Sequence, residues 1–184
     1  IKKEKEITAY HEAGHAVLAS ILPNADPVHK VSIVARGRAG GYTLKLPVED
    51  RRLQSKKEFL DDIAMSLGGY VAEELIFGDV TTGPSNDLQV STSLARAMVT
   101  RWGMSDAIGP VALESDGGKI IHGYVDGGKD YSEEMSAVID REVKKIMTDS
   151  LELARKTIGE NKKVLDAIAK KLLEVETLEQ DEYN

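Results

Sequence analysis

Two histidines with a glutamate directly after the first form the most reactive group in this 184-residue chain, the run His11-Glu12-Ala13-Gly14-His15. An α-helix advances by slightly more than one turn over this spacing, so His11 and His15 project from one face and both imidazoles can reach one metal ion. Glu12 then lies beside the metal, where its carboxylate can take a proton from water rather than bind the ion. The spacing is typical of zinc-dependent peptide hydrolases.

The residues around the motif predict the helix that it requires. Apolar positions recur with a helical period and put the motif on a buried stripe, and Pro23 ends the segment. The alternative is that His11 and His15 are two ordinary helical histidines. The apolar positions are Ile7, Tyr10, Gly14, Val17, Leu18 and Ile21.

A third ligand is needed, because a catalytic zinc site normally takes three protein ligands and leaves a fourth position to water. One zinc-protease pattern has a third histidine six residues after His15, but Ile21 stands there, and Leu18 replaces the glycine of that pattern. That pattern is excluded. His29 falls in an expected strand and His122 in a loop-like region, where surface or packing roles are favoured.

Three carboxylates are candidates for the third ligand. Glu73 and Glu74 stand in the apolar end of the second expected helix, and Asp87 stands in the first turn of the third. Asp87 also has a structural interpretation, since an acid at a helix N-terminus satisfies free amides and the helix dipole. Spacing alone does not choose among the three.

The N-terminal half of the chain predicts helices and one β-hairpin. Strand patterns at 29–34 and 42–46 flank a glycine-rich turn. A capping box at Ser55 and Glu58 starts a second helix that Gly78 ends. A third helix is expected from residues 85–87 to Gly103, with its apolar face made by Leu88, Ala95, Met98, Val99 and Trp102.

The C-terminal half predicts more helix. Short extended segments are expected at 110–113 and 120–124. A long helix from Ser132 and a second one through 164–172 are expected to form a helical hairpin. Thr177 and Gln180 indicate a further helix start. The predicted fold is therefore mainly α with a small β-hairpin or sheet, with a C-terminal helical hairpin.

Composition narrows the class of protein. The formal charge of −7 argues against nucleic-acid binding, which needs clustered Lys and Arg. The absence of cysteine excludes a disulfide framework and cysteine-bound zinc. There is no apolar run of about 18 residues, so the piece is expected to be soluble as it stands, with any membrane anchor outside it. The start at Ile1 rather than methionine suggests a fragment of a longer protein.

Five separated motifs follow one another along the chain: Tyr10–Val17, Gly41–Thr43, Ala72–Glu74, Thr82–Leu88 and Trp102–Ser105. In this order they resemble the peptidase domain of the FtsH family of membrane-anchored, ATP-dependent zinc metalloproteases, and the resemblance covers nearly the whole chain. The sequence departs from the family at Pro84, where alanine is more usual, and at Tyr70, which replaces an arginine. Neither position matches a ligand.

The resemblance implies a role for each site residue. His11, His15 and Asp87 match the zinc ligands of the family, and Glu12 matches its catalytic glutamate. Glu73 is interpreted as the carboxylate that orients a ligand imidazole by accepting its free N–H. The alternative for Glu73 is an ordinary surface acid.

The hairpin offers a second site. An edge strand can bind an extended polypeptide through backbone hydrogen bonds with little sequence preference. The residues alone slightly favour an ordinary hairpin strand, whereas the resemblance favours this substrate-binding strand, which comprises Gly41, Tyr42, Thr43 and Leu44.

The resemblance also implies the wider organisation. Residues 1–184 would form a zinc metallopeptidase domain with a catalytic part at 1–105, a helical part at 131–184 and one Zn²⁺ per chain. An AAA+ ATPase domain and transmembrane segments would precede it, so ATP and the membrane would be used only through those absent parts. The parent would be a homohexamer that degrades unfolded or misfolded polypeptides in protein quality control, with this domain on the cytoplasmic side of an inner membrane, or on the matrix or stromal side in an organelle.

A rival interpretation is a catalytically silent hexamerisation domain with a structural zinc. Glu12 separates the two, because a closed structural site needs no base beside its ligands. No nucleic-acid partner is expected.

Overall fold

Helices dominate the computed structural model, which describes residues 1–34, 42–45, 53–115 and 131–179. A small sheet completes these ranges, so the predicted mainly α fold with a small β part is confirmed. The helices are α1 (Lys2–Ile21), α2 (Lys56–Ser66), α3 (Gly68–Phe77), α4 (Ser85–Thr100), α5 (Glu133–Glu160) and α6 (Lys162–Val175); the strands are β1 (Val28–Ser32), β2 (Tyr42–Lys45) and β3 (Thr177–Glu179).

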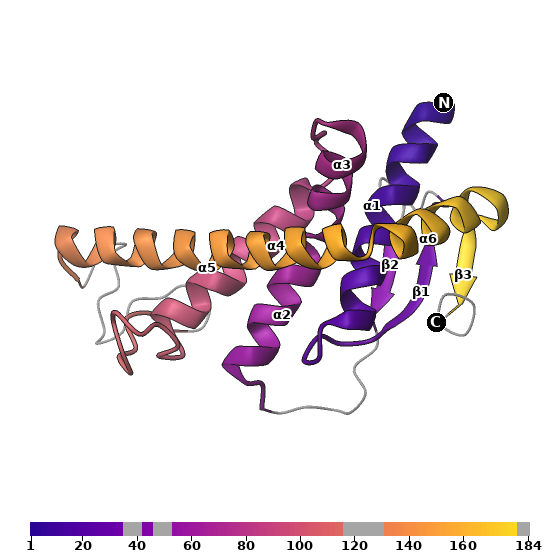
Figure 1. Ribbon diagram of the computed structural model, residues 1–184. Coiled ribbons are helices and arrows are strands. Elements are labelled where there is room, and N and C mark those ends of the chain that lie inside the picture. Colours follow the sequence, from indigo (N-terminus) through magenta and orange to yellow (C-terminus); the bar gives the residue numbers. More distant parts are fainter. Residues whose placement is uncertain (35–41, 46–52, 116–130, 180–184) are drawn as a thin grey trace.

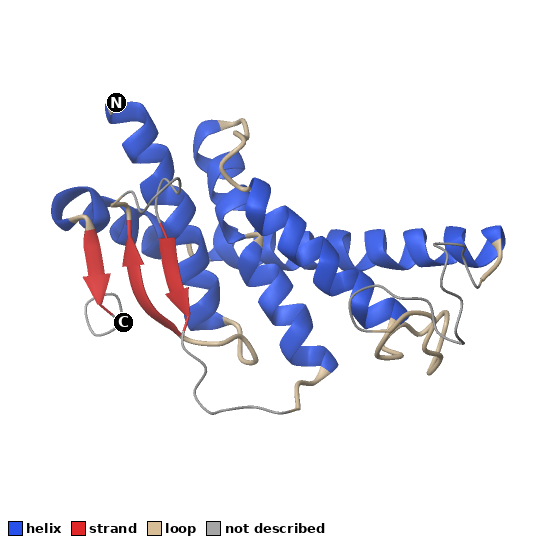
Figure 2. Cartoon of the chain, turned by 180° about the vertical axis from the view of Figure 1, so that it is seen from behind, coloured by secondary structure: helices blue, strands red, loops and turns tan. Residues whose placement is uncertain are grey.

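The long helix α5 organises the arrangement. Figure 1 shows α5 running across α2, α3 and α4, with α1 beside α3 and the sheet at the far end next to α1 and α6. Figure 2 shows the same layers from behind, with the sheet in front of α1. Helix α1, which carries the histidine motif, is therefore covered by α3 and by both C-terminal helices.

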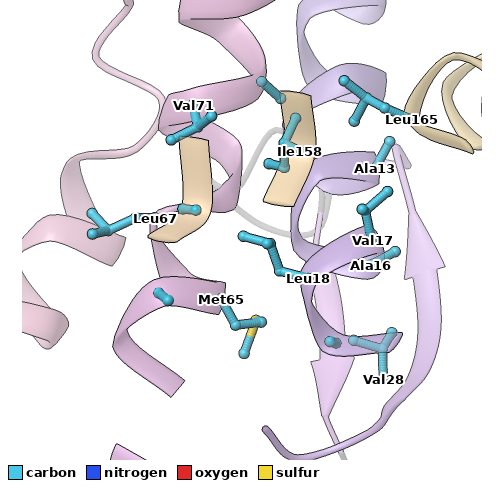
Figure 3. Close-up of a cluster of buried hydrophobic side chains, with 14 of the residues drawn as sticks. Ala13, Ala16, Val17, Leu18, Val28, Met65, Leu67, Val71, Ile158 and Leu165 are labelled. Atoms are coloured by element: carbon cyan, nitrogen blue, oxygen red, sulfur yellow. The ribbon is translucent and has the colours of Figure 1, made fainter. Parts of the chain in front are cut away.

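The core gathers around the second half of α1. Val17 and Leu18 are fully buried and meet Ile158 from α5 and Leu165 from α6, which are also fully buried (Figure 3). Burying each such side chain stabilises the fold by about 1.5–3 kcal/mol. The C-terminal helices thus hold in place the helix that carries the histidines.

The sheet is antiparallel, with the strand order β2-β1-β3. The predicted pairing of the first two strands is confirmed, with Val31 opposite Thr43. On the other side Val31 lies opposite Leu178 of β3. Among the described residues, β2 is therefore an edge strand.

The helix predicted from Ser55 to Gly78 is interrupted. The N-cap is as predicted, because Ser55 Oγ accepts a hydrogen bond from the Glu58 N–H at 3.2 Å, and Gly78 ends α3 with a φ of 68°. The break falls at Leu67, whose ψ is −3°, directly before Gly68 and Gly69. The periodic apolar pattern continues across the break, so the prediction of one helix was wrong.

The C-terminal helical hairpin is not formed. Figure 1 shows α6 continuing in the direction of α5 rather than folding back, and α6 packs mainly against α1. One residue, Asn161, separates the two helices, whereas an antiparallel helix pair needs a loop of about two to five residues. The prediction relied on the apolar faces of both helices. It was wrong because the link between them is too short to reverse the chain.

The helix start predicted at Thr177 is also wrong, because Thr177–Glu179 form β3. Glu176 adopts a left-handed conformation, with a φ of 65°, and this turns the chain into the sheet. Leu178 is then buried.

Two extended segments were predicted between α4 and α5. Residues 110–113 form no strand, although the Leu113 and Glu114 N–H groups both donate to Thr100 O. The segment predicted at 120–124 lies outside the described residues. Among the described helices, none combines the length and apolar character needed to cross a bilayer.

Candidate metal centre

The histidine pair lies on the buried face of α1, as its spacing predicts. His11 and His15 are 9% and 5% exposed, and their ring centroids are 4.7 Å apart. Their Nε2 atoms face each other at 3.1 Å. One helical turn therefore brings two imidazole nitrogens to a common point.

Asp87 reaches the same point from a different helix. It stands in the first turn of α4, and its Oδ2 lies 3.2 Å from Nε2 of His11 and 3.2 Å from Nε2 of His15. The ligand atoms of the three residues lie within 4.8 Å of one another. Of the carboxylates that spacing left open, Asp87 is the one whose oxygen faces both Nε2 atoms.

The other ring nitrogens are also held. His15 Nδ1 lies 2.8 Å from Met65 O, and His11 Nδ1 lies 3.1 Å from Glu73 Oε2. Since a carbonyl and a carboxylate can only accept, each Nδ1 carries the proton and donates it, and Nε2 keeps a lone pair for a metal. Met65 stands one residue before the end of α2, so the carbonyl that His15 contacts lies next to the break between α2 and α3.

Glu73 and Glu74 have different surroundings. Glu73 is 1% exposed, so the surface-acid alternative is wrong. Its Oε1 accepts hydrogen bonds from the Thr81 N–H at 3.1 Å and from the Thr81 hydroxyl at 2.5 Å. Glu74 points to α5, where both of its oxygens bind the Arg155 guanidinium at 2.9 and 3.0 Å.

Small residues let α1 and α3 approach closely enough for these contacts. A Cβ atom at Gly68 would lie 2.6 Å from Gly14 O, and one at Gly14 would meet the Gly68 carbonyl in turn. A Cβ atom at Gly69 would collide with the His11 ring. Gly14, inside the motif, therefore serves the helix contact, and Gly69 leaves the space that His11 occupies.

The charges of the site favour a cation where the three residues meet. Burial disfavours a charged His11 ring, but hydrogen bonds to Asp87 and Glu73 and the negative charge of Glu12 outweigh it and raise the pKa of His11 to about 10. Burial also opposes ionisation of Asp87, yet the hydrogen bonds from His11 and His15 hold its pKa well below the usual range. Burial raises the pKa of Glu73, but hydrogen bonds from His11 and Thr81 outweigh this effect and lower it.

Glu12 completes the centre. It is 5% exposed, and its Oε1 lies 4.0 Å from His11 Nε2. This places a carboxylate beside the converging nitrogens, outside the group of ligand atoms that His11, His15 and Asp87 bring together.

The residues present fit a zinc ion. Two imidazoles and one carboxylate are a common ligand set for catalytic zinc, and the three ligand atoms converge from two helices. Both ring N–H groups are held by acceptors, as in other zinc sites. The negative charge that favours a proton on His11 also favours a divalent cation.

Some functional residues were not anticipated from the sequence. Thr81 and the Met65 carbonyl gave no signal that sequence reasoning could use, because their roles depend on contacts between separate elements. The Gly68-Gly69 pair gave one, since adjacent glycines inside a helical pattern cost stability and point to a close approach.

The predicted substrate strand is described in part. Tyr42, Thr43 and Leu44 belong to β2, at the edge of the sheet, and Gly41 lies outside the described residues. His29 falls in β1, and His122 also lies outside the described residues.

Comparisons with known proteins agree with this chemistry. The family model for peptidase family M41 matches residues 1–184. The chain is 51% identical over 179 residues to the ATP-dependent zinc metalloprotease FtsH 3 of Petrotoga mobilis, covering 96% of this chain and 28% of that protein. It is 48% identical over 183 residues to the ATP-dependent zinc metalloprotease FtsH of Bacillus subtilis, covering 98% and 29%. The chain thus spans less than a third of the length of the curated relatives it matches.

Proposed function

Because this chain belongs to peptidase family M41, we propose that it is a zinc-dependent endopeptidase domain and that His11, His15 and Asp87 hold the metal. The observation that carries the proposal is the convergence of two Nε2 atoms and one carboxylate oxygen, with Glu12 directly beside them. When bound, zinc supplies a Lewis acid that polarises the scissile carbonyl and acidifies water.

Glu12 moves the proton in this reaction. Its carboxylate accepts a proton from the attacking water, whose oxygen bonds to the carbonyl carbon of the peptide. Glu12 then gives this proton to the amide nitrogen as the carbon–nitrogen bond breaks. Its burial and its position next to His11 Nε2 support this role, since they keep the carboxylate close to where the carbonyl must bind.

The substrate is an extended polypeptide. Residues 42–44 of β2 bind it by adding a strand to the edge of the sheet. The proposed substrate-binding residues also include the adjacent Gly41, which lies outside the described residues. Backbone hydrogen bonds carry no sequence information, so the cleavage preference is broad and unfolded or misfolded chains are favoured.

The wider organisation is part of the same proposal, and the names of the relatives, ATP-dependent zinc metalloproteases, support only its dependence on ATP. A separate ATPase domain unfolds the substrate, and hexamer assembly and a membrane anchor belong to the longer parent. One Zn²⁺ is bound per chain. Residues 1–105 form the catalytic part, and residues 131–184 form a helical part that supports it.

The test is the zinc content and casein cleavage of Asp87→Ala. We expect the wild-type protein to bind one zinc per chain and to cleave casein, a loosely folded substrate, and the variant to lose both. Asp106→Ala is the matched control, because the Asp106 carboxylate is fully exposed and forms a surface ion pair with Lys56, at 3.6 Å. An Asp87→Ala protein with full zinc content and full activity would contradict the ligand assignment.

A further inference from the structure

Thr81 connects to the metal centre through two hydrogen bonds to the same oxygen. Its backbone N–H and its hydroxyl both donate to Glu73 Oε1, at 3.1 and 2.5 Å. The other oxygen of this carboxylate, Oε2, accepts from His11 Nδ1 at 3.1 Å. A chain of hydrogen bonds thus runs from Thr81 through Glu73 to His11.

A further donor determines which way the Thr81 hydroxyl hydrogen points. The Gly83 N–H donates to Thr81 Oγ1 at 3.0 Å. A backbone N–H can only donate, so Thr81 Oγ1 accepts from Gly83 and its own hydrogen is left to point at Glu73. The carboxylate is then held at Oε1, and Oε2 is aimed at the imidazole.

Thr81 also lies close in sequence to Asp87. It lies in the segment that leads from α3 to α4, six residues before Asp87. Backbone hydrogen bonds from Ser85 N to Thr82 O and from Leu88 N to Pro84 O continue from this segment into the first turn of α4. The contact between Thr81 and Glu73 therefore fastens the segment that delivers Asp87 to the residue that orients His11.

We propose that Thr81 is a positioning residue for the metal centre: it holds the Glu73 carboxylate so that His11 keeps its Nδ1 proton and presents Nε2 to the metal. This role presupposes the proposed function only in taking His11 as a metal ligand. Removing a group that hydrogen-bonds to a metal ligand and orients it typically weakens metal binding by about 10-fold to 100-fold.

The experiment measures Co²⁺ affinity by competition with a chromophoric chelator, together with the visible absorption spectrum of the Co²⁺-loaded protein. Thr81→Val removes the hydroxyl and keeps the shape of the side chain. We expect about 10-fold weaker binding, at the low end of the range because the Thr81 N–H still donates, and a shifted spectrum. Thr81→Ser, which keeps the hydroxyl, should bind as the wild type does.

Three further comparisons separate positioning from general damage to the fold. Thr82→Val is the matched control, since Thr82 is the adjacent exposed threonine and its substitution should leave affinity and spectrum unchanged. Thr81→Ala deletes the same hydroxyl without the branched side chain and should repeat the loss. In a Glu73→Ala background, Thr81→Val should cause no additional loss, because Thr81 acts through Glu73.

Wild-type affinity and spectrum in Thr81→Val, or an equal loss in Thr81→Ser, would overturn the role of the hydroxyl. The full additional loss in the Glu73→Ala background would do the same. A protein that binds Co²⁺ with this dependence on Thr81 but cleaves no peptide would leave the positioning role standing and refute the proposed function, so the two failures are distinguishable.

Discussion

The metal centre and the C-terminal helices are held together by different physical means. Around the centre, buried polar groups meet in hydrogen bonds, such as His15 Nδ1 to Met65 O, and glycines bring α1 against α3. In α5 and α6 the inner face is apolar, with Ile158 and Leu165 fully buried. Their outer face carries exposed ion pairs, such as the one between Lys171 and Glu174.

This difference predicts how each region responds to substitution. Geometry at the centre depends on a few directional contacts, so a small change in shape or charge should alter metal binding or catalysis. The C-terminal helices contribute buried apolar area, which is not directional, so a change there should alter the free energy of unfolding and leave the chemistry intact.

The largest expected effect is that of Glu12→Gln. The amide keeps the shape of the side chain but cannot accept the proton, so the rate of casein cleavage should fall by about 10²- to 10⁴-fold. Zinc content should stay at one per chain, because Glu12 is not among the proposed ligands. Glu4→Gln, at an exposed position of the same helix, is the control. Full activity in Glu12→Gln would contradict the assignment of Glu12 as the group that moves the proton, whereas a zinc-loaded wild-type protein that cleaves no casein would favour the rival interpretation, a silent assembly domain with a structural zinc.

Ile158→Ala tests the other side of the comparison. The side chain is fully buried between α5 and α1, and its truncation should lower the free energy of unfolding by about 2–5 kcal/mol. Urea denaturation measures this change. Leu153→Ala, at a position on α5 that is 37% exposed, should cost much less. The folded Ile158→Ala protein should keep wild-type Co²⁺ affinity, and a weakened affinity would mean that the two regions are coupled.

Gly69→Ala should affect both stability and metal binding. The added methyl group would collide with the His11 ring, and overpacking of this kind costs about 1–3 kcal/mol. Because the displaced ring is a proposed ligand, Co²⁺ affinity should fall as well. Gly159→Ala in α5 is the matched control, since nothing lies within 4 Å of its added Cβ; it should stabilise the helix by about 0.5–1 kcal/mol. Unchanged Co²⁺ affinity in Gly69→Ala would show that His11 tolerates the methyl group.

The same contrast explains what could be predicted from the sequence. The positions of His11 and His15 follow from the helical period alone, and the pairing of β1 with β2 follows from strand patterns around a glycine-rich turn. The choice of Asp87 among three carboxylates depends on where the packing of α4 against α2 and α5 places its first turn, which spacing does not encode. Resemblance to a known family supplied that choice.

Three wrong predictions, which concern the α2–α3 break, the direction of α6 and the strand β3, each trace to a local backbone feature that periodicity does not reveal. Apolar periodicity runs through Leu67 without interruption, so the break between α2 and α3 was not visible in it; the close contact of Gly68 with Gly14 accompanies that break. The direction of α6 depends on the single residue Asn161, and β3 depends on the left-handed conformation of Glu176. Periodicity identifies the buried face of an element but not the direction in which the next element leaves.

The smallest expected effect is that of Lys171→Gln, which removes one partner of an exposed ion pair in α6. Lys171 Nζ lies 3.8 Å from Glu174 Oε2, and both side chains are at least half exposed. Pairs at this spacing contribute about 0.2–0.5 kcal/mol, and less when the lysine precedes the acid in the helix. Urea denaturation should therefore show a change at or below about 0.5 kcal/mol, which shrinks further in high salt because exposed charges are screened. A loss of Co²⁺ affinity in this variant would contradict the division between the two regions, since no contact described for Lys171 leads to the metal centre.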